Sequence, residues 1–201
     1  MLYFLFQDHA IFRALWSNTH HVARLVWRSN HPTYRRLCRI KQLGVKNVLS
    51  LRGNTKKSPY FFEKESCDRL GLTLTVIGLS ARNVWRKERV IALLDYFDNT
   101  DTPFLMHCKS GADRTSLAAA YYLIYKCGSS VAQARKQLGM RYLHFKWTKT
   151  GVLDFMLDEY ERFSNQNPDR DLRYWTTNVY DADAIKQAFN QERAAKGKSQ
   201  I

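Results

Sequence analysis

The stretch PFLMHCKSGADRTSLAAAYYLIYK, residues 103–126, joins two apolar segments through a short polar one. PFLMH predicts a buried strand that ends at His107, and RTSLAAAYYLIYK predicts a buried helix that begins at Arg114. The polar residues between them then form the turn from strand to helix. Such a turn points backbone N–H groups at one spot, where the helix dipole adds positive potential. The sequence therefore predicts an anion-binding loop that contains a cysteine.

Four residues of this region suit phosphate-ester chemistry. Helix N-termini and cationic neighbours lower a cysteine pKa from about 8.5 to roughly 3.5–7.5, which would make Cys108 a thiolate nucleophile at neutral pH. Arg114 follows in a C-x5-R spacing, from which its planar guanidinium can grip two phosphate oxygens. Thr115 can donate its hydroxyl to the sulfur, and Gly111 lets the chain bend around a bound group. Cys108 alone would also fit a small buried residue, but the combination predicts a site.

Strands and helices alternate in the first half of the chain. Strand-like stretches occur at residues 21–27, 45–51, 72–79 and 103–107, and helical patterns occur at 33–44, 58–71 and 86–99. Gly44 and Gly71 stand where helix C-caps belong. After residue 107 the patterns are helical, at 114–126, 130–139, 150–163 and 181–197. We expect a single α/β domain, with a central, mostly parallel sheet flanked by helices and a helical C-terminal half.

The domain limits follow from composition. Residues 1–21 form an aromatic-rich N-terminal segment, 22–163 the α/β domain, and 164–201 a helical extension entered through the loop SNQNPDRDL at 164–172. The stretches MLYFLF and FRALW at the start of the chain would either pack into the core or lie against a membrane.

Charge and cysteine usage restrict the function classes. The net charge is +14, which favours anionic partners such as phosphates, acidic lipids or nucleic acid. The four cysteines contain no C-x-x-C pair, so we expect neither a structural metal nor disulfides. No apolar run approaches the ~20 residues of a membrane span. We therefore expect a cytoplasmic protein without a cofactor, and peripheral contact with an anionic membrane stays open.

HCKSGADRT resembles the phosphate-binding signature, HC-x5-R followed by Ser or Thr, of the cysteine-dependent protein tyrosine and dual-specificity phosphatases. WRSNHPT, LGVKNVLSLRG and GMRYLHFKWTKTGVLDFMLDEYE resemble other parts of small bacterial members, so that the likeness covers most of residues 22–163. VYDADAIKQAF carries a weaker likeness. The resemblance implies the fold of that superfamily and a metal-free, two-step reaction through a phosphocysteine. It also implies that the phosphate is bound by His107, Lys109, Ser110, Gly111, Ala112 and Thr115.

The general acid departs from the family pattern. Members usually carry an aspartate on a loop before the strand that leads to the cysteine, but GLSARNVWRKE at 78–88 has none. Its carboxylate, Glu88, is expected in the next helix. Asp113 stands directly before the signature arginine, and this position of an aspartate is similar to that in the myotubularin-like phosphoinositide phosphatases and in some bacterial tyrosine or lipid phosphatases. In those enzymes the phosphate-binding loop itself is thought to supply the acid. Asp113 is therefore our first candidate acid, and Glu88 is the second. For Asp113, the alternative is that it orients Arg114 or caps the helix.

The substrate stays open between a phosphotyrosine-type protein and a phosphoinositide or other lipid phosphate. Lys109 beside the cysteine, with Arg82 and Arg86 in the basic loop, favours a polyanionic substrate. Arg141, Lys146 and Lys149 either extend this basic patch or form a solvated face. Two alternatives are an RNA 5′-phosphatase and a catalytically silent module that binds phosphorylated ligands. Nucleic acid is not favoured as a partner, because no RNA-binding signature accompanies the charge.

Overall fold

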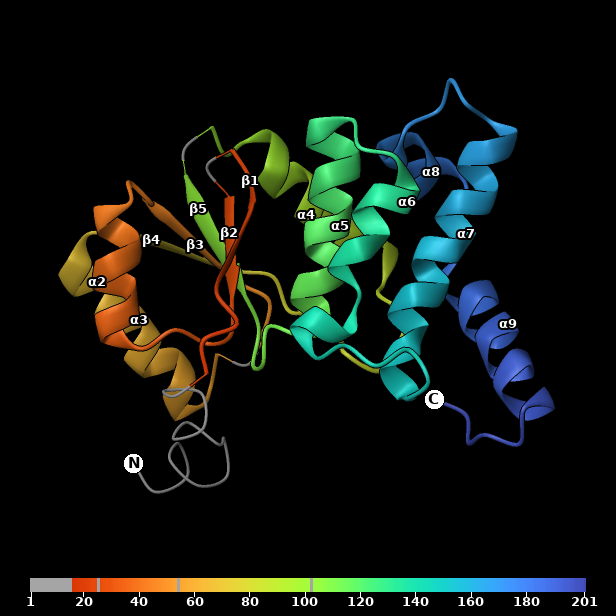
Figure 1. The fold of residues 1–201 in the computed structure, drawn as a ribbon, viewed down its shortest axis with the longest axis horizontal. Helices are drawn as coiled ribbons and strands as arrows, with labels where there is room; N and C mark the ends of the chain where they lie inside the picture. The colour runs from red at the N-terminus through yellow and green to blue at the C-terminus, as the bar shows by residue number, and fades with distance from the viewer. Residues whose placement is uncertain (1–15, 25, 54, 102) are drawn as a thin grey trace. The chain divides into compact units, whose positions relative to one another are not determined.

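The computed structural model describes residues 16–201 except 25, 54 and 102. The chain forms two compact units (Figure 1). Unit 1 contains the described part of Met1–Gly78 together with Thr100–Thr115, and unit 2 contains Leu79–Asn99 and Ser116–Ile201. MLYFLF and most of FRALW lie outside the described residues, so the two interpretations of this segment stay predictions, as do the domain limits at 21/22 and 163/164.

Five strands of unit 1 form one sheet in the order β1-β2-β5-β3-β4. The pairs of β2 with β5, β5 with β3, and β3 with β4 are parallel, and β1 pairs antiparallel with β2 at the edge. The α/β class and the mostly parallel sheet are thus confirmed. The strands are β1 His20–Ala23, β2 Val26–Ser29, β3 Asn47–Ser50, β4 Thr73–Val76 and β5 Phe104–His107.

The helices of unit 1 are α2, Tyr34–Gln42, and α3, Ser58–Leu70. Thr33 caps α2 by accepting a hydrogen bond from the Arg36 N–H, and Pro59 occupies the first turn of α3. Their buried side chains join those of β3 and β5 in one core cluster. Gly44 and Gly71 have positive φ, at 86° and 64°, which confirms the predicted helix ends. The cluster consists of Leu37, Ile40, Val45, Val48, Cys67, Leu72 and Leu105.

Residues 21–27 correct our prediction of one continuous strand. The chain reverses there, so that β1 and β2 form an antiparallel pair with Ala23 opposite Val26. Arg24 adopts a left-handed φ of 45°. This turn could not be predicted from the sequence, because residues other than glycine rarely adopt a positive φ.

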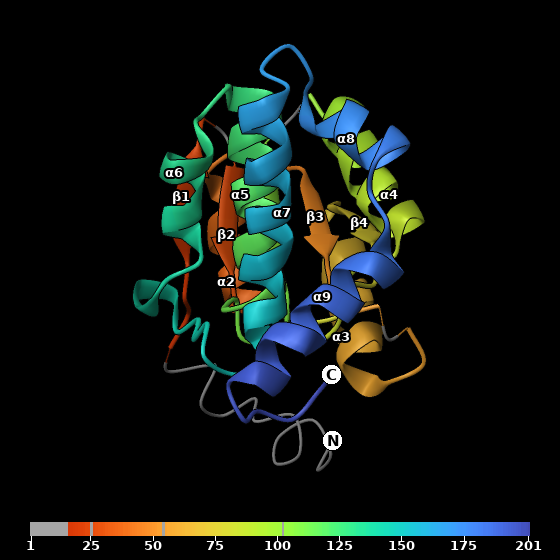
Figure 2. The same cartoon turned by 90° about the vertical axis from the view of Figure 1, so that its right-hand side faces the viewer.

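Unit 2 is helical, as predicted for the second half of the chain. Helix α8 contacts α4 and α7, and α9 contacts α7 (Figure 2). The helix predicted at 130–139 is instead the short α6 followed by a 3-10 turn, η2, and α8 was not predicted. The elements are α4 Lys87–Asp98, α5 Arg114–Cys127, α6 Val131–Ala134, η2 Arg135–Gln137, η3 Met140–Tyr142, η4 Lys149–Gly151, α7 Val152–Gln166, α8 Leu172–Asn178 and α9 Ala182–Ala195.

A polar network joins three helices of unit 2 around Asp98. Its carboxylate accepts hydrogen bonds from the Tyr125 hydroxyl at 2.7 Å and from Arg173 at 2.8 Å. Arg173 also pairs with Asp95 at 2.9 Å, and Lys126 pairs with Asp98. This network fixes α8 against α4 and α5. Among the described residues, no helix combines the length and the hydropathy required to cross a bilayer.

Candidate active site

The register of the sheet brings three segments to one edge. Ser29 at the end of β2 and Ser50 at the end of β3 are both in register with His107 at the end of β5. Because these strands are parallel, the residues that follow them emerge at the same carboxyl edge, where ligands of open α/β sheets bind. The segment after β5 runs from Cys108 to Asp113, and α5 begins at Arg114. The predicted strand, loop and helix are therefore confirmed.

The carbonyl oxygens of four successive residues in this loop are held from outside it. Since each peptide carries its N–H opposite its carbonyl, outward carbonyls favour N–H groups that face the inside of the loop, as an anion requires. The Cys108 carbonyl accepts from Nδ1 of His107 at 3.3 Å, and the Lys109 carbonyl accepts from the backbone N–H of His31 at 3.2 Å. The Ser110 carbonyl accepts from the side-chain amide of Asn18 at 3.2 Å, and the Gly111 carbonyl accepts from the guanidinium of Arg28 at 2.6 Å.

Gly111 lies tightly against the backbone at the end of β2. Its φ is +72°, and a Cβ atom there would lie 2.7 Å from the carbonyl oxygen of Ser29 and 2.8 Å from the backbone nitrogen of Asn30. Both obstacles are backbone atoms, which cannot rotate away. The position therefore accepts only glycine.

The Cys108 thiol is buried and polarised by its neighbours. Burial by itself would raise the pKa of Cys108, but the Arg114 charge and hydrogen bonds from the hydroxyl and backbone N–H of Thr115 outweigh it, so that this pKa lies below its ordinary value. The charge of Asp113 raises the pKa of Cys108, so Asp113 lies close enough to the sulfur to interact with it electrostatically. The arrangement favours a thiolate.

The buried carboxylate of Glu63 contacts two histidines that hold the loop. Glu63 of α3 lies 2.5 Å from Nε2 of His107 and 3.8 Å from Nδ1 of His31, and all three side chains are buried. Burial would raise the pKa of Glu63, but the two histidines and a hydrogen bond from Ser50 lower it to about 2. One ring nitrogen of His107 thus faces this carboxylate, while the other faces the Cys108 carbonyl. Sequence reasoning missed Glu63 because it is separated from the loop by more than 40 positions.

The donor atoms of His31, Glu63 and His107 all lie within 4.8 Å of one another, a grouping that could hold a metal ion. The contacts of Glu63 with both histidines explain this grouping without one. The predicted absence of a metal from the site stays a prediction.

A cavity of about 250 Å³ opens in unit 1 beside the loop. Arg114 and Lys109 line it, together with Arg52 and Lys57 from the segment after β3. The Arg114 guanidinium donates a hydrogen bond to the Leu51 carbonyl at 3.2 Å, which holds it near the loop. Arg52 and Lys57 were not among the residues predicted from the sequence. The basic stretch LRGNTKK directly after a predicted parallel strand could have indicated them, because ligands of open α/β sheets bind at the carboxyl ends of the strands.

The remaining predicted residues divide between the two units. In unit 1, Ser110 and Asp113 are half-buried, Ala112 is buried, and the Ser110 hydroxyl accepts a hydrogen bond from the Ala112 N–H. In unit 2, Arg82 and Arg86 are exposed on the segment before α4, and Arg86 is the N-cap residue of that helix.

Trp85 fixes this basic segment within unit 2. Its indole N–H donates to the Ser80 carbonyl at 2.7 Å, and its own carbonyl accepts from the Tyr180 hydroxyl at 2.5 Å. Glu88 lies in the first turn of α4, as the sequence predicted, and is exposed. The roles of Arg82 and Arg86 in substrate binding stay predictions.

A cysteine at the base of an anion loop, followed by the arginine that opens the next helix, defines the class of cysteine-dependent protein tyrosine and dual-specificity phosphatases. The chain is a member of that superfamily. It belongs to the family described as DSP-PTPase phosphatase fused to NAD+ kinase, whose model matches residues 14–151. Comparison with curated proteins found no match.

Solved structures of phosphatases share the fold. The chain is 20% identical to TpbA of P. aeruginosa, with a TM-score of 0.57, over 86% of this chain and 90% of that one. It is 18% identical to the core catalytic domain of the PP-IP phosphatase SIW14 of S. cerevisiae, with a TM-score of 0.57, over 75% and 93%. A DUF442 protein of Shewanella putrefaciens, whose phosphatase activity is assigned by name alone, is 18% identical with a TM-score of 0.58, over 75% of this chain and 98% of that one. At these identities the likeness shows the fold.

Proposed function

We propose that this protein hydrolyses phosphate monoesters through a phosphocysteine formed on Cys108. The observation that carries the proposal is the buried Cys108 thiol, whose pKa is lowered by Arg114 and Thr115 in a loop with outward carbonyls. The thiolate supplies the nucleophile, and the loop N–H groups supply donors for the phosphate oxygens. Membership of a phosphatase family supports the same conclusion.

The first step forms the phosphoenzyme. The Cys108 sulfur attacks phosphorus, an S–P bond forms, and the P–O bond to the alcohol or phenol breaks. Arg114 and the loop N–H groups stabilise the charge that develops on the phosphoryl oxygens. Asp113 gives its proton to the leaving oxygen, so that the product departs as a neutral hydroxyl group.

The second step releases phosphate. A water molecule attacks phosphorus and gives a proton to the Asp113 carboxylate. The S–P bond breaks, and inorganic phosphate departs. The sulfur leaves as a thiolate, which the hydrogen bonds from Thr115 stabilise. Both steps use only groups of this chain and water.

Hydrolysis of a small aryl phosphate by the purified protein tests the proposal. We expect turnover that rises with pH until the Cys108 thiol is ionised, and then falls once the acid loses its proton. Because the pKa of Cys108 is lowered, the rising limb should lie below the usual range of a free thiol. A folded protein that binds phosphate but shows no turnover would instead indicate the silent binding module.

Asp113→Asn tests the proton donor. We expect the variant to hydrolyse an alkyl phosphate about 10²-fold more slowly or worse, because an alkoxide leaves poorly without a proton. A phosphate of a very acidic phenol should lose much less, and the falling alkaline limb of the pH–rate profile should disappear. Steady-state rates of both substrates across pH provide the measurement.

Asparagine keeps the shape of aspartate and most of its hydrogen bonds, so a structural role of Asp113 predicts a different pattern. Equal losses for both substrates, with the alkaline limb retained, would exclude Asp113 as the donor. Glu88→Gln is the matched variant, and it should leave the two substrates and the pH profile unchanged.

We further propose that the substrate carries more than one phosphate group, as an inositol phosphate or phosphoinositide does. The support is the set of four cationic side chains around the cavity, Arg52, Lys57, Lys109 and Arg114, against one carboxylate, Glu63, that is already paired with histidines. The names of structural neighbours agree with either substrate class. One structure of TpbA is a complex with phosphotyrosine, and SIW14 is named a PP-IP phosphatase.

Neutralising three of these cations separates the substrate classes. Arg52→Gln, Lys57→Gln and Lys109→Gln together should raise KM for an inositol polyphosphate by about 10-fold or more, and should change KM for a phosphotyrosine peptide far less. The difference should shrink at high salt, because ionic contacts are screened over roughly 8–10 Å at ordinary ionic strength. Lys64→Gln with Arg69→Gln, which removes two cations from exposed ion pairs on α3, serves as the matched pair and should leave both KM values unchanged. Equal changes for both substrates would contradict the polyanionic preference.

A further inference from the structure

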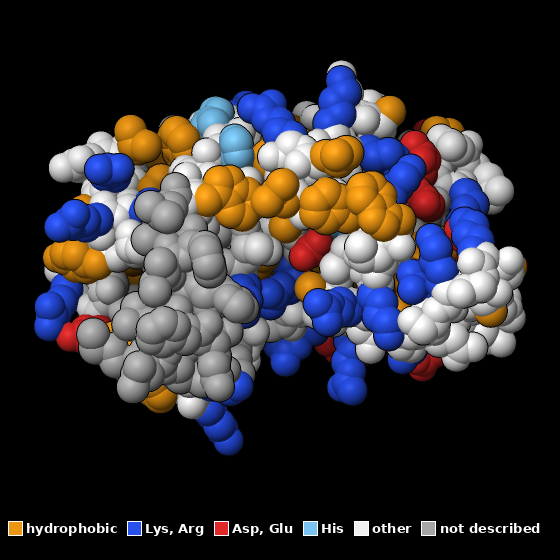
Figure 3. Space-filling model, turned by 60° about the horizontal axis from the view of Figure 1, so that its bottom comes forward, with side chains coloured by type: hydrophobic (Ala, Val, Ile, Leu, Met, Phe, Trp, Pro, Cys, Tyr) orange, Lys and Arg blue, Asp and Glu red, His pale blue; other side chains and the backbone are white. Residues whose placement is uncertain are grey.

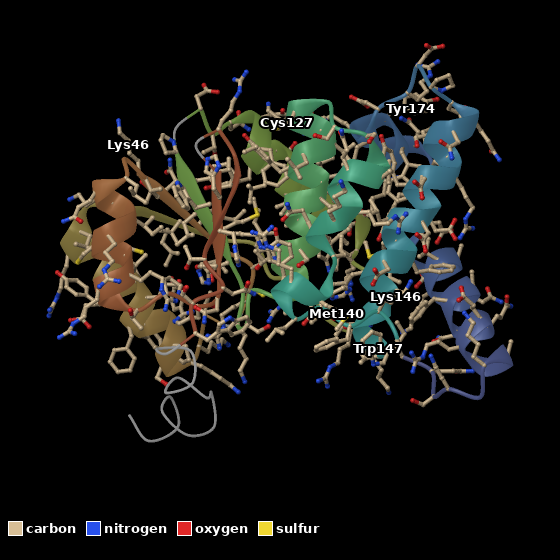
Figure 4. All side chains as sticks on the ribbon, in the orientation of Figure 1. Lys46, Cys127, Met140, Lys146, Trp147 and Tyr174 are labelled. Atoms are coloured by element: carbon tan, nitrogen blue, oxygen red, sulfur yellow. The ribbon has the colours of Figure 1, made fainter. Side chains whose placement is uncertain are left out.

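The segment between α6 and α7 displays large apolar side chains to solvent. Met140 is 67% exposed, Leu143 47% and Trp147 56%, and they lie within eight residues of one another. Figure 4 shows Met140 and Trp147 at the same end of unit 2. Single exposed apolar residues are ordinary on protein surfaces, but three in one short segment indicate an interaction site.

This segment is firmly anchored, so the exposure is built into the fold. Tyr142 and His144 alternate with the exposed residues and are buried, and the His144 ring pairs with Asp154 of α7 at 2.7 Å. Gly151 packs so closely on the backbone of Lys146 that a Cβ atom would lie 1.9 Å from the Lys146 carbonyl oxygen. Leu143 itself sits at a φ of 61°. The buried residues therefore hold the exposed ones outward.

Basic side chains are interleaved with the apolar ones. Arg141, Lys146 and Lys149 are exposed in the same segment, and the sequence has no Asp or Glu from Arg114 to Leu153. The Lys198 ammonium lies 3.5 Å from the Trp147 carbonyl and adds a further positive charge. Figure 3 shows a row of hydrophobic side chains on this side of the structure, with Lys and Arg side chains above and below the row and some Asp or Glu side chains beside it.

We infer that Met140, Arg141, Leu143, Lys146, Trp147 and Lys149 form a docking surface for an anionic lipid bilayer. Charge complementarity selects this occupant: all three charged residues of the surface are basic, and a bilayer with acidic headgroups offers negative charge above an apolar layer. Met, Leu and Trp side chains on a rigid segment can enter that layer to the depth of the headgroups. The Lys and Arg side chains are long enough to remain among the phosphates while their stems cover apolar surface. This inference does not depend on the proposed catalytic activity.

Vesicle flotation with the full chain tests the inference. The protein should float with vesicles of phosphatidylglycerol and phosphatidylcholine, and should remain unbound with phosphatidylcholine alone. Met140→Ser, Leu143→Ser and Trp147→Ser together should reduce the apparent affinity at least about 10-fold, because the apolar contribution to partitioning is lost. Arg141→Gln, Lys146→Gln and Lys149→Gln together should reduce it about 100-fold at low salt.

Phe61→Ser with Phe62→Ser is the matched control, since these side chains of α3 are 57% and 43% exposed and belong to unit 1. This control should bind vesicles like the unchanged protein. Thermal unfolding establishes that each variant is folded. In addition, brominated lipids should quench tryptophan fluorescence in the unchanged protein and quench it much less in Trp147→Phe.

Three results would overturn the inference. The first is absence of binding to anionic vesicles, and the second is unchanged binding by the folded Ser variant. The third is equal binding to neutral and anionic vesicles, which would remove the charge argument. None of these results concerns Cys108, so failure here leaves the proposed function intact, and failure of the catalytic proposal leaves the docking surface intact.

Discussion

Replacing Cys108 by serine should reduce the turnover of any phosphate monoester by more than about 10³-fold, since loss of a covalent nucleophile can cost a hydrolase about 10⁶ in kcat. A serine hydroxyl in this loop has the shape of the thiol but holds its proton far more tightly, so that no anion is available to attack phosphorus. The loop N–H groups and Arg114 remain, so the variant should still bind phosphate. Steady-state kinetics and calorimetric titration with phosphate provide the two measurements.

The chain supplies its own control for this substitution. Cys127, at the end of α5, is an exposed free cysteine, and Figure 4 labels it at the surface of unit 2. Cys127→Ser should therefore retain full turnover. Activity above a few per cent of wild type in Cys108→Ser would exclude the covalent mechanism, even if the fold and the phosphate affinity were unchanged.

Replacing Arg114 by lysine should lower kcat/KM by about 10²–10³-fold, the loss that follows removal of one well-placed charge-stabilising donor. The positive charge is kept, but an ammonium cannot present two parallel N–H groups to a phosphoryl group. Arg69→Lys, in an exposed pair with Glu65 on α3, is the matched exchange and should leave the kinetics unchanged.

The division of the Arg114→Lys loss between kcat and KM shows whether Arg114 acts in the transition state or only in substrate binding. If Arg114 binds the phosphoryl group more strongly as charge develops, most of the loss should appear in kcat. A lysine variant with wild-type kcat/KM would show that a single point charge suffices, and the proposed clamp would then be wrong.

The sequence predicted those features that depend on neighbours along the chain. Pro59 and Gly71 delimit α3 because their backbone preferences are local, and the strand, loop and helix around Cys108 follow from apolar runs on either side of a polar turn. The left-handed Arg24 hid the hairpin of β1 and β2. Helix α8 has only seven residues, and its cap, Asp171, lies inside a stretch that is typical of a loop.

The supporting residues of the site could not be predicted from the sequence, for a topological reason. β5 lies between β2 and β3 in the sheet but follows both in the chain. Consequently Arg28, His31 and Glu63, which hold the loop, are far from it in sequence. Hydrophobic periodicity locates strands, but the order of the strands in the sheet decides which side chains meet at its edge.

Trapping the covalent intermediate tests the central claim most directly. The protein is mixed with an activated aryl phosphate, quenched within the first turnover, digested and analysed by mass spectrometry, with Cys108→Ser treated in parallel. We predict one phosphoryl group on the Cys108 sulfur, formed at least as fast as phenol is released and absent from the serine variant. Release of phenol without phosphorylated Cys108, or with the phosphoryl group on another side chain, would contradict the mechanism.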